Sequence, residues 1–181
     1  MNKPIIFIGD SITLGLEVSE IGQHAINLGI GGNTTTGLLY RMIYVPWRDE
    51  NIVVLTIGIN DLTYGISDAT TMSNYESILN NMSKGFLVFV NSVLPVDDHK
   101  VPSSIKNRTN NKNIDELNEK IKTLCANRDN CHYIDNRDLF LNIKDAYMPD
   151  GIHLTPAGYE VWTNSLKAAL GNDVRKSIRP K

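Results

Sequence analysis

The chain has 181 residues, of which 41% are apolar and 21% are charged. This composition fits one compact globular domain and excludes a disordered or fibrous protein. The formal net charge is −2, and because binding to phosphate backbones needs a concentrated basic face, we expect no nucleic-acid partner.

Membrane and export signals are not evident in this sequence. No apolar run approaches the roughly 20 residues that a membrane helix needs, and the first residues resemble a strand rather than a signal peptide. We therefore expect a soluble, cytoplasmic protein without a membrane span. Cys125 and Cys131 could form a local disulfide in an exported protein, but without an export signal we expect reduced thiols. The sequence leaves the oligomeric state open.

Short apolar runs alternate along the chain with longer segments of helical character. This alternation is typical of a parallel sheet that is covered by helices on both faces. Strands are predicted at residues 4–8, 25–28, 52–57, 86–91 and 132–134. Helices are predicted at residues 35–44, 68–82, 113–127 and 156–170. The last helix begins well, because Thr155 can cap it and Pro156 stands at its first position.

We expect one domain over residues 1–170, followed by a basic C-terminal tail at residues 171–181. The tail contains Arg175, Lys176, Arg179 and Lys181, with Asp173 as its one acidic residue. A solvated, frayed terminus is the expected state of such a segment.

The first predicted strand runs directly into Gly9, Asp10 and Ser11. Ser11 would lie at the carboxyl end of a buried strand and at the start of a helical turn, where backbone N–H groups and the helix dipole favour a negative charge. This is a suitable place for a nucleophile. The alternative is that Asp10 and Ser11 only cap the turn.

The second predicted strand is followed by a glycine-rich loop, NLGIGGNTTTG, with Gly29, Gly31 and Gly32 within four residues. Glycines permit positive φ and close approach to a ligand, so this loop could direct a backbone N–H toward a developing oxyanion. The spacing matches neither the dinucleotide fingerprint nor a phosphate-binding loop, so we expect no nucleotide cofactor. Gly31 and Gly32 cannot be separated as the donor at this stage.

The third predicted strand ends in the segment GIND, which brings Asn60 to the same edge of the sheet as Ser11. The side-chain amide of Asn60 could be a second oxyanion donor. The alternative is a turn, since Asn and Asp favour turns after strands. We expect Asp61 to have that structural role and to anchor the turn by hydrogen bonds.

A long polar stretch at residues 95–113 follows the fourth predicted strand and contains two prolines. Loops of this length in compact domains are often functional. Loops at the carboxyl ends of strands surround the ligand crevice in open α/β sheets. This segment is therefore a candidate wall of the substrate site.

Near the C-terminus, Asp150 and His153 lie three residues apart in MPDGIHLTPAGY. On a tight turn the carboxylate can accept a hydrogen bond from the imidazole, fix its tautomer and stabilise the imidazolium. His24 and His132 lie at strand starts, the opposite edge of a parallel sheet, and His99 lies in the long loop. A metal site would need three or four ligands, and no companion cluster is visible, so we expect no metal.

Taken together, four segments resemble the successive blocks of the SGNH (GDSL-type) hydrolases. They are Gly9-Asp10-Ser11, the glycine loop that ends in Gly32-Asn33, Gly58-Ile59-Asn60-Asp61, and Asp150-Gly151-Ile152-His153. They span residues 9–153 and occur in the order of the family. The stretch INLGIGGNTTTGLLYRM is similar to the platelet-activating-factor acetylhydrolase branch and its bacterial relatives.

The resemblance implies a flavodoxin-like, three-layer α/β/α fold with a five-stranded parallel sheet, and hence an SGNH hydrolase domain over residues 1–170. It implies that Ser11 is the nucleophile, His153 the base and Asp150 its partner. Gly32 and Asn60 would join the amide of Ser11 in the oxyanion hole. The implied activity is that of a serine esterase that needs no cofactor.

We expect a small ester as the substrate, with an acetyl group on a polar alcohol such as a sugar. The long loop has few aliphatic side chains and no aromatic ones to receive a long acyl chain, and Asp97, Asp98, Lys106, Arg108 and Asn110 there could bind a hydroxylated leaving group. Against this, residues 38–40 could form an acyl groove, so lysophospholipase or thioesterase activity remains open, as does acyl transfer to an alcohol.

Two other classes of protein compete with an esterase. An inactivated hydrolase scaffold that binds carbohydrate would have lost a catalytic position, and here all five are present. A flavodoxin-like nucleotide-binding protein is favoured only by the pattern of layers, and fold alone does not imply function.

Overall fold

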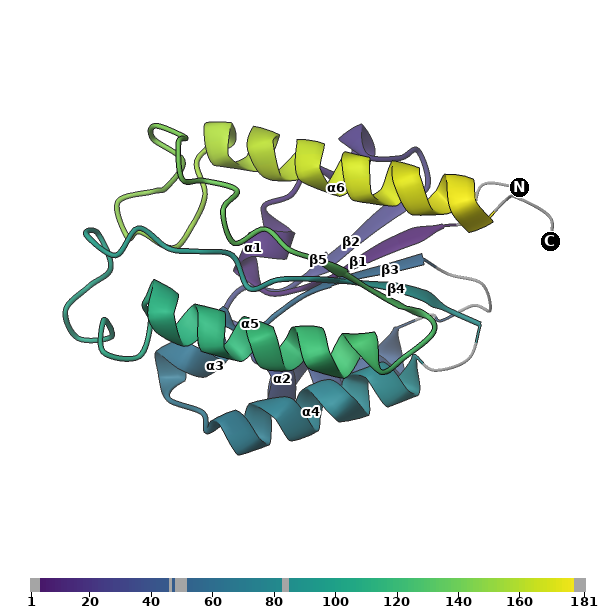
Figure 1. Cartoon of the computed structure of the whole chain (residues 1–181), viewed down its shortest axis with the longest axis horizontal. Helices are drawn as coiled ribbons and strands as arrows, with labels where there is room; N and C mark the ends of the chain where they lie inside the picture. The colour runs from purple at the N-terminus through teal and green to yellow at the C-terminus, as the bar shows by residue number, and fades with distance from the viewer. Residues whose placement is uncertain (1–3, 46, 48–51, 83–84, 178–181) are drawn as a thin grey trace.

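The structure is a computed structural model that describes residues 4–45, 47, 52–82 and 85–177 (Figure 1). Its strands are β1 (Ile5–Gly9), β2 (Ala25–Gly29), β3 (Ile52–Thr56), β4 (Leu87–Asn91) and β5 (Cys131–Ile134). Its α-helices are α1 (Ser11–Leu14), α2 (Thr35–Arg41), α3 (Ile59–Tyr64), α4 (Asp68–Asn81), α5 (Asn111–Ala126) and α6 (Pro156–Ser177). Two short 3-10 helices cover Val18–Glu20 and Met42–Tyr44.

The five strands form one parallel sheet in the order β2-β1-β3-β4-β5. Successive residues of a strand face opposite sides, so the sheet supports two apolar clusters. Ile6 and Ile8 pack in the cluster that includes side chains of α2, α4 and α5. Phe7 packs in the cluster that includes side chains of α1 and α6. Figure 1 shows α6 on one side of the sheet and α2, α4 and α5 on the other, which confirms the predicted three-layer α/β/α fold.

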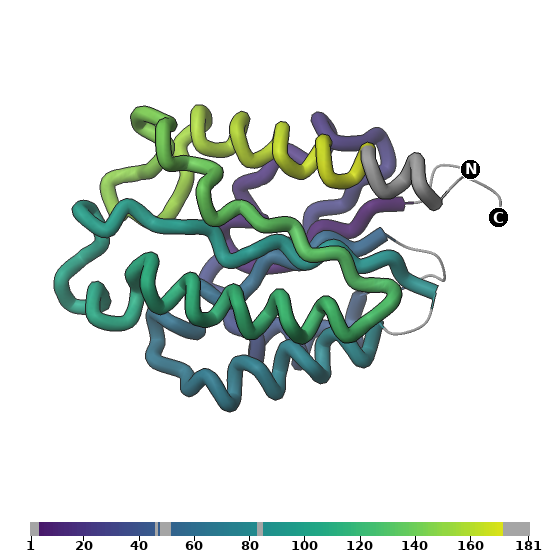
Figure 2. Tube along the Cα trace, viewed as in Figure 1, coloured from purple at the N-terminus to yellow at the C-terminus, as the bar shows by residue number. Residues whose placement is uncertain are grey.

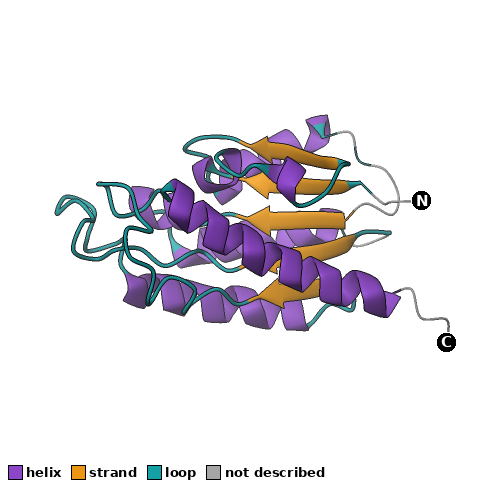
Figure 3. Ribbon diagram, turned by 90° about the horizontal axis from the view of Figure 1, so that it is seen from above, coloured by secondary structure: helices purple, strands orange, loops and turns teal. Residues whose placement is uncertain are grey.

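The order of the strands determines where a ligand can bind. The chain adds strands on one side of β1 and then on the other, so the order reverses between β1 and β3. In open α/β sheets ligands bind beside the carboxyl ends of the strands at such a switch point. Figure 3 shows that the strands run in one direction and that the longer loops gather at their carboxyl edge.

The predicted helices differ from the observed ones mainly at their ends. The segment 35–44 is an α-helix only to Arg41 and then tightens to a 3-10 turn. The helix predicted at 156–170 continues to Ser177, seven residues into the expected tail, while Arg179 and Lys181 lie outside the described residues. Thr155 caps it as predicted, because its Oγ1 accepts a hydrogen bond from the backbone N–H of Gly158. No helix in the described part of the chain is long and apolar enough to cross a membrane.

The expectation of reduced thiols was wrong, because Cys125 and Cys131 form a disulfide. Cys125 lies in the last turn of α5 and Cys131 begins β5. The short return between helix and strand brings their Cα atoms to 5.3 Å, a separation that a disulfide can span. The bond ties the end of α5 to the amino edge of the sheet.

Candidate active site

Ser11 lies where β1 ends and α1 begins, at the switch point of the sheet. Asp10 caps α1, since its Oδ1 accepts a hydrogen bond of 2.9 Å from the backbone N–H of Ile12. Gly9 is required at the end of the strand, because a Cβ there would lie 2.0 Å from the carbonyl oxygen of Thr56. The capping role that the sequence allowed for Asp10 is therefore real, and it leaves the hydroxyl of Ser11 free to face another side chain.

The helix that begins at Ser11 is held from two directions by residues that sequence reasoning missed. A helix of four residues is not stable by itself. Asn27 of β2 donates from Nδ2 to the carbonyl oxygens of Thr13 (2.8 Å) and Leu16 (2.9 Å). Tyr159 of α6 donates from its hydroxyl to the carbonyl of Ile12 at 3.1 Å. A polar residue in the middle of an apolar strand is the one signal that could have pointed to Asn27.

Asp150 and His153 lie on a tight turn just before α6. The turn passes through Gly151, whose φ is +72°, a conformation that favours glycine. Oδ1 of Asp150 accepts hydrogen bonds from the backbone N–H groups of Ile152 (2.9 Å) and His153 (3.0 Å). Oδ2 lies 2.6 Å from Nδ1 of His153, and Nε2 of His153 lies 2.9 Å from Oγ of Ser11. The structure thus brings the three predicted catalytic residues into one line of contacts.

Hydrogen bonding determines the charge state of Asp150. Burial alone would raise its pKa, but the hydrogen bonds from the imidazole of His153 and from two backbone N–H groups outweigh burial, so the pKa lies below its ordinary value. An ionised Asp150 can only accept, so Nδ1 of His153 carries the proton that it donates. Nε2 is then the free acceptor, and it faces the hydroxyl of Ser11.

The pKa of Asp10 shifts in the opposite direction from that of Asp150, because Asp10 is almost fully buried. Burial raises its pKa from the ordinary value of 3.8 to about 7, although the hydrogen bond from Ile12 and the nearby His153 act in the other direction. The residue beside Ser11 is therefore a carboxyl group that titrates near neutrality. Sequence reasoning treated Asp10 only as a cap.

The glycine loop and Asn60 lie at the same edge of the sheet as Ser11. The loop is tied to β1 by a hydrogen bond from the backbone N–H of Ile30 to the carbonyl of Gly9. Nδ2 of Asn60, the second residue of α3, donates to the backbone carbonyl of Asn33 at 3.0 Å. Gly32 has a φ of +71°, so a side chain there would be strained. The choice of Gly32 over Gly31 as the oxyanion donor stays a prediction.

Asp61 anchors a different element from the one expected. Its carboxylate is buried and accepts hydrogen bonds from the backbone N–H and the hydroxyl of Thr35, with a longer one of 3.4 Å from Thr71. It therefore holds the start of α2, which follows the glycine loop, rather than its own turn. The segment after β3 is the short helix α3 and not a simple turn.

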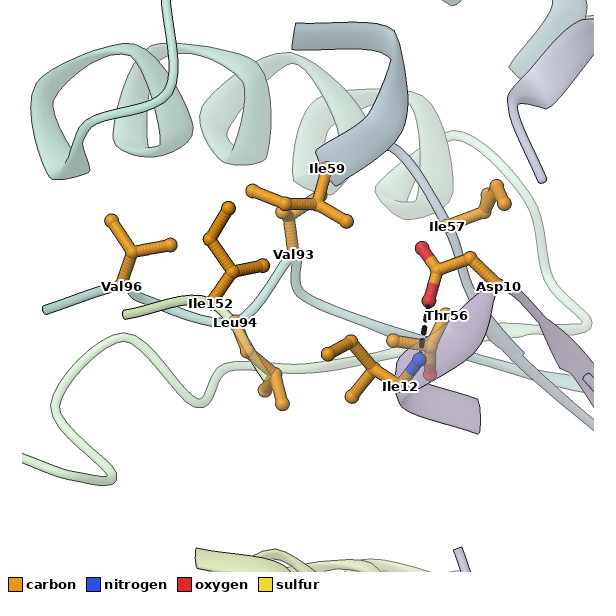
Figure 4. A pocket seen from close by; sticks show the side chains of 9 residues that line it. All are labelled: Asp10, Ile12, Thr56, Ile57, Ile59, Val93, Leu94, Val96 and Ile152. Carbon is orange, nitrogen blue, oxygen red and sulfur yellow. Dashed lines mark hydrogen bonds between the residues drawn. The ribbon is translucent and has the colours of Figure 1, made fainter. Parts of the chain in front are cut away.

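A narrow, mainly apolar pocket is lined by residues that include the sequence neighbours of Ser11 and His153 (Figure 4). It is lined by Asp10, Ile12, Thr56, Ile57, Ile59, Val93, Leu94, Val96 and Ile152. Its interior has room for little more than a water-sized group. Figure 4 shows Ile12, Ile59 and Ile152 around this space. Val96 belongs to the segment at residues 95–113 that was predicted as a wall of the site, whereas Val93 and Leu94, just before it, were not predicted.

The loop after β4 lies against the turn that carries His153, and Figure 2 shows both segments at the carboxyl end of the sheet. The backbone N–H of Asp97 donates to the carbonyl of Gly151 at 2.8 Å. Two of the polar side chains expected to face a substrate bind the start of α5 instead. Asp98 accepts from Asn111, and Asn110 caps α5.

Three further residues considered from the sequence lie away from the site. Leu38, considered for an acyl groove, is fully buried in the core. His132 lies near the start of β5 and stacks on Phe89, and His24 precedes β2, so both lie at the amino edge of the sheet. Among the described residues, no group of three or more His, Cys, Asp or Glu side chains could hold a metal ion.

Comparison with known sequences points to one enzyme family. A family model described as the GDSL-like lipase/acylhydrolase family matches residues 7–161. Platelet-activating factor acetylhydrolase IB subunit alpha1 of Rattus norvegicus is 27% identical over 186 residues, which cover 92% of this chain and 74% of that protein.

Solved structures show the same fold. A protein from Streptococcus pneumonia, provisionally described as a platelet activating factor, superposes with a TM-score of 0.84 at 25% identity, over 94% of this chain and 85% of that one. Axe2, an acetylxylan esterase from Geobacillus stearothermophilus, superposes with a TM-score of 0.73 at 17% identity, over 94% of this chain and 94% of that one. At this identity the likeness is one of fold alone.

Proposed function

The chain belongs to the GDSL-like lipase/acylhydrolase family, and from this premise we propose that it is a serine esterase that removes a short acyl group, above all acetyl, from a polar alcohol such as a sugar. The family supplies the acylhydrolase activity, and the site supplies the roles of the residues. The observation that carries the proposal is the line of contacts from Asp150 through His153 to Ser11.

The first step is acylation of Ser11. As Oγ attacks the ester carbonyl carbon, Nε2 of His153 takes the hydroxyl proton over the existing 2.9 Å contact. Asp150 keeps the imidazole in the required tautomer and stabilises the imidazolium that forms. The imidazolium then protonates the alcohol oxygen as the ester bond breaks, and the alcohol leaves.

The negative charge on the carbonyl oxygen is held by the oxyanion hole. We assign its donors to the backbone N–H groups of Ser11 and Gly32 and to Nδ2 of Asn60. One N–H of Asn60 already donates to Asn33, which leaves the second N–H of the same amide for the substrate. Donors that are fixed before the reaction stabilise the transition state without the cost of reorienting water.

The second step is hydrolysis of the acyl enzyme. His153, neutral again after the alcohol has left, removes a proton from a water molecule that attacks the acyl carbon. Ser11 then regains its proton from the imidazolium and the acid leaves. Both steps use the same three side chains and the same donors.

The narrow pocket supports a short acyl group. Its walls include the side chains of Ile12, Ile59 and Ile152, which can receive a methyl group but leave no space for a long chain. Each buried methylene gains about 0.8 kcal/mol only where apolar walls receive it. An acetyl group therefore matches the pocket better than a longer acyl group does.

The open side of the site supports a polar alcohol as the leaving group. The side chains of Asp150 and His153 are 42% and 44% exposed, so a large hydrated alcohol can approach from solvent. Two of the similar proteins are named for acetyl esters, an acetylhydrolase and an acetylxylan esterase. These names favour acetyl as the acyl group, and the second favours a sugar hydroxyl as its carrier.

A second candidate is lysophospholipase or thioesterase activity. Leu14, Ile30 and Tyr64 are 56%, 48% and 62% exposed, and they belong to α1, the glycine loop and the end of α3. Such side chains around the carboxyl edge of the sheet could receive an apolar substrate outside the narrow pocket.

The deciding experiment compares kcat/KM for p-nitrophenyl acetate, butyrate, octanoate and palmitate, together with the release of acetate from acetylated sugars. We expect the highest value for acetate and measurable deacetylation of the sugars. A maximum at octanoate or longer would favour the second candidate. A maximum at acetate in which an added alcohol, rather than water, receives the acyl group would identify an acyltransferase.

A further inference from the structure

The loop that carries Gly32 is irregular, so it needs contacts from outside to hold its shape. Its backbone is tied to β1 through Ile30, and to α3 through Asn60. A third tie comes from the far end of the following helix, where Arg41 is the last residue of α2. The side chain of Arg41 reaches back along the helix to the loop.

Arg41 makes two hydrogen bonds that join the loop to the strand before Ser11. Its Nε donates to Oδ1 of Asn33 at 2.7 Å, and its Nη2 donates to the carbonyl oxygen of Gly9 at 2.8 Å. The same carbonyl accepts the N–H of Ile30 at 3.1 Å. One guanidinium group therefore links Asn33, which follows Gly32, to Gly9, which lies two positions before Ser11.

Asn33 connects this clamp to the third oxyanion donor. Its side chain accepts from Arg41 while its backbone carbonyl accepts from Asn60. The absence of a side chain at Gly37 makes room for it, because a Cβ there would lie 2.3 Å from Nδ2 of Asn33. Movement of Asn33 would therefore displace both the glycine loop and the amide of Asn60.

From these contacts we infer that Arg41 is a positioning residue for the oxyanion hole. This inference rests on the function proposed above. Arg41 holds Asn33 and the end of β1 at a constant separation, and so places Gly32 and Asn60 relative to Ser11. Positioning matters here because a displacement of about 1 Å can reduce a rate roughly 10²-fold.

Arginine is required for this role because two donors on one rigid plane point to two different acceptors. The single ammonium group of a lysine lacks the planar fork that reaches both of them. Arg41 is only partly exposed, and burial lowers the pKa of its guanidinium. The side chain thus bears a cost of desolvation that its two hydrogen bonds offset.

The test compares Arg41→Met and Arg41→Lys with Arg128→Met as the matched control. Arg128 lies just after the end of α5 and likewise donates to a carbonyl, that of Leu124, and to a side-chain amide, that of Asn80, but it lies at the amino edge of the sheet. The measurements are kcat and KM with p-nitrophenyl acetate, and the inhibition constant of a trifluoromethyl ketone, which places an oxyanion in the hole.

We expect Arg41→Met to lower kcat by about 30-fold or more with KM changed less than about 3-fold, and to weaken the ketone by a similar factor. Arg41→Lys should lie between this variant and the wild type, and Arg128→Met should keep the wild-type values. If Arg41→Met does not fold, Arg41→Lys tests the inference, because the inference also requires this variant to lose kcat at a constant KM.

The double variant Arg41→Met/Asn33→Ala should lose no more activity than Arg41→Met alone, because both changes break the same contact. Wild-type kcat and ketone affinity in folded Arg41 variants would overturn the inference, even if their Tm is lower. A failure of the proposed function is distinct, because Ser11→Ala would then keep the wild-type activity.

Discussion

The side-chain amide of Asn60 donates a hydrogen bond to the backbone carbonyl of Asn33, so α3 and the glycine loop meet at one contact. The second N–H of that amide is the donor that we assign to the oxyanion. Asn60→Ala should therefore lower kcat roughly 10²-fold or more with little change in KM, because the charge it stabilises exists only in the transition state. Steady-state kinetics check this. The control is Asn130→Ala, which removes a similar amide that donates to the carbonyls of Met82 and Phe86.

The buried carboxyl of Asp10 predicts a pH-dependent stability. Its pKa in the folded protein is about 7, above the ordinary value of 3.8, so between these values the folded chain binds a proton that the unfolded chain has released. The free energy of unfolding therefore falls as the pH rises through this window, by at most about 1.4 kcal/mol per pH unit. Asp10→Asn removes this titration and keeps an acceptor for the N–H of Ile12.

Urea unfolding of the wild type and Asp10→Asn at pH 4.5 and pH 8 measures this effect. We expect the difference in unfolding free energy to move in favour of the variant as the pH rises. A difference that stays constant between the two pH values would show that Asp10 is ionised throughout.

The narrow pocket predicts that acyl length can be changed by one substitution. Ile152→Ala removes apolar volume from the pocket wall beside His153, so the ratio of kcat/KM for butyrate to that for acetate should rise about 10-fold. Ile26→Ala is the control, because Ile26 is half-exposed on the edge strand β2. An unchanged ratio in Ile152→Ala would place the acyl group elsewhere.

The disulfide predicts a stability effect without a catalytic one. Cys125 and Cys131 are separated by six positions, and closing a loop of this size contributes roughly 2 kcal/mol. The double variant Cys125→Ala/Cys131→Ala should lose about that much free energy of unfolding and keep its kcat, since the bond lies at the edge of the sheet opposite Ser11. Titration of two free thiols in the native protein would contradict the pairing. The cytoplasmic location stays a prediction, and a disulfide argues against it.

The parts of the site that the sequence predicts are those that follow strands. Ser11, Gly32 and Asn60 each come directly after an apolar run, and carboxyl ends of parallel strands meet at one edge. Asp150 and His153 could be paired because they are neighbours in the chain on a short turn. Local pattern and sheet topology therefore placed Ser11, the glycine loop and Asn60 at one edge, and the resemblance to the SGNH hydrolases implied that Asp150 and His153 join them.

The contacts that support them could not be predicted, because each joins segments that are distant in sequence. Asn27 binds α1, and Arg41 binds Gly9, 32 positions away. Nothing in the local pattern distinguishes Arg41 from a solvated arginine at a helix end. Two polar residues of the loop after β4 were wrongly expected to bind substrate. Asp98 and Asn110 instead accept hydrogen bonds from backbone N–H groups at the start of α5.

The central claim is that Ser11 forms the acyl enzyme, and covalent labelling tests it most directly. The protein is incubated with an organophosphonate or a sulfonyl fluoride, and the modified residue is located by mass spectrometry of its peptides. We predict one adduct per chain, on Ser11, with loss of activity in proportion to labelling, and no adduct on Ser11→Ala. Full activity after complete labelling of another residue, or an active Ser11→Ala variant, would contradict the account.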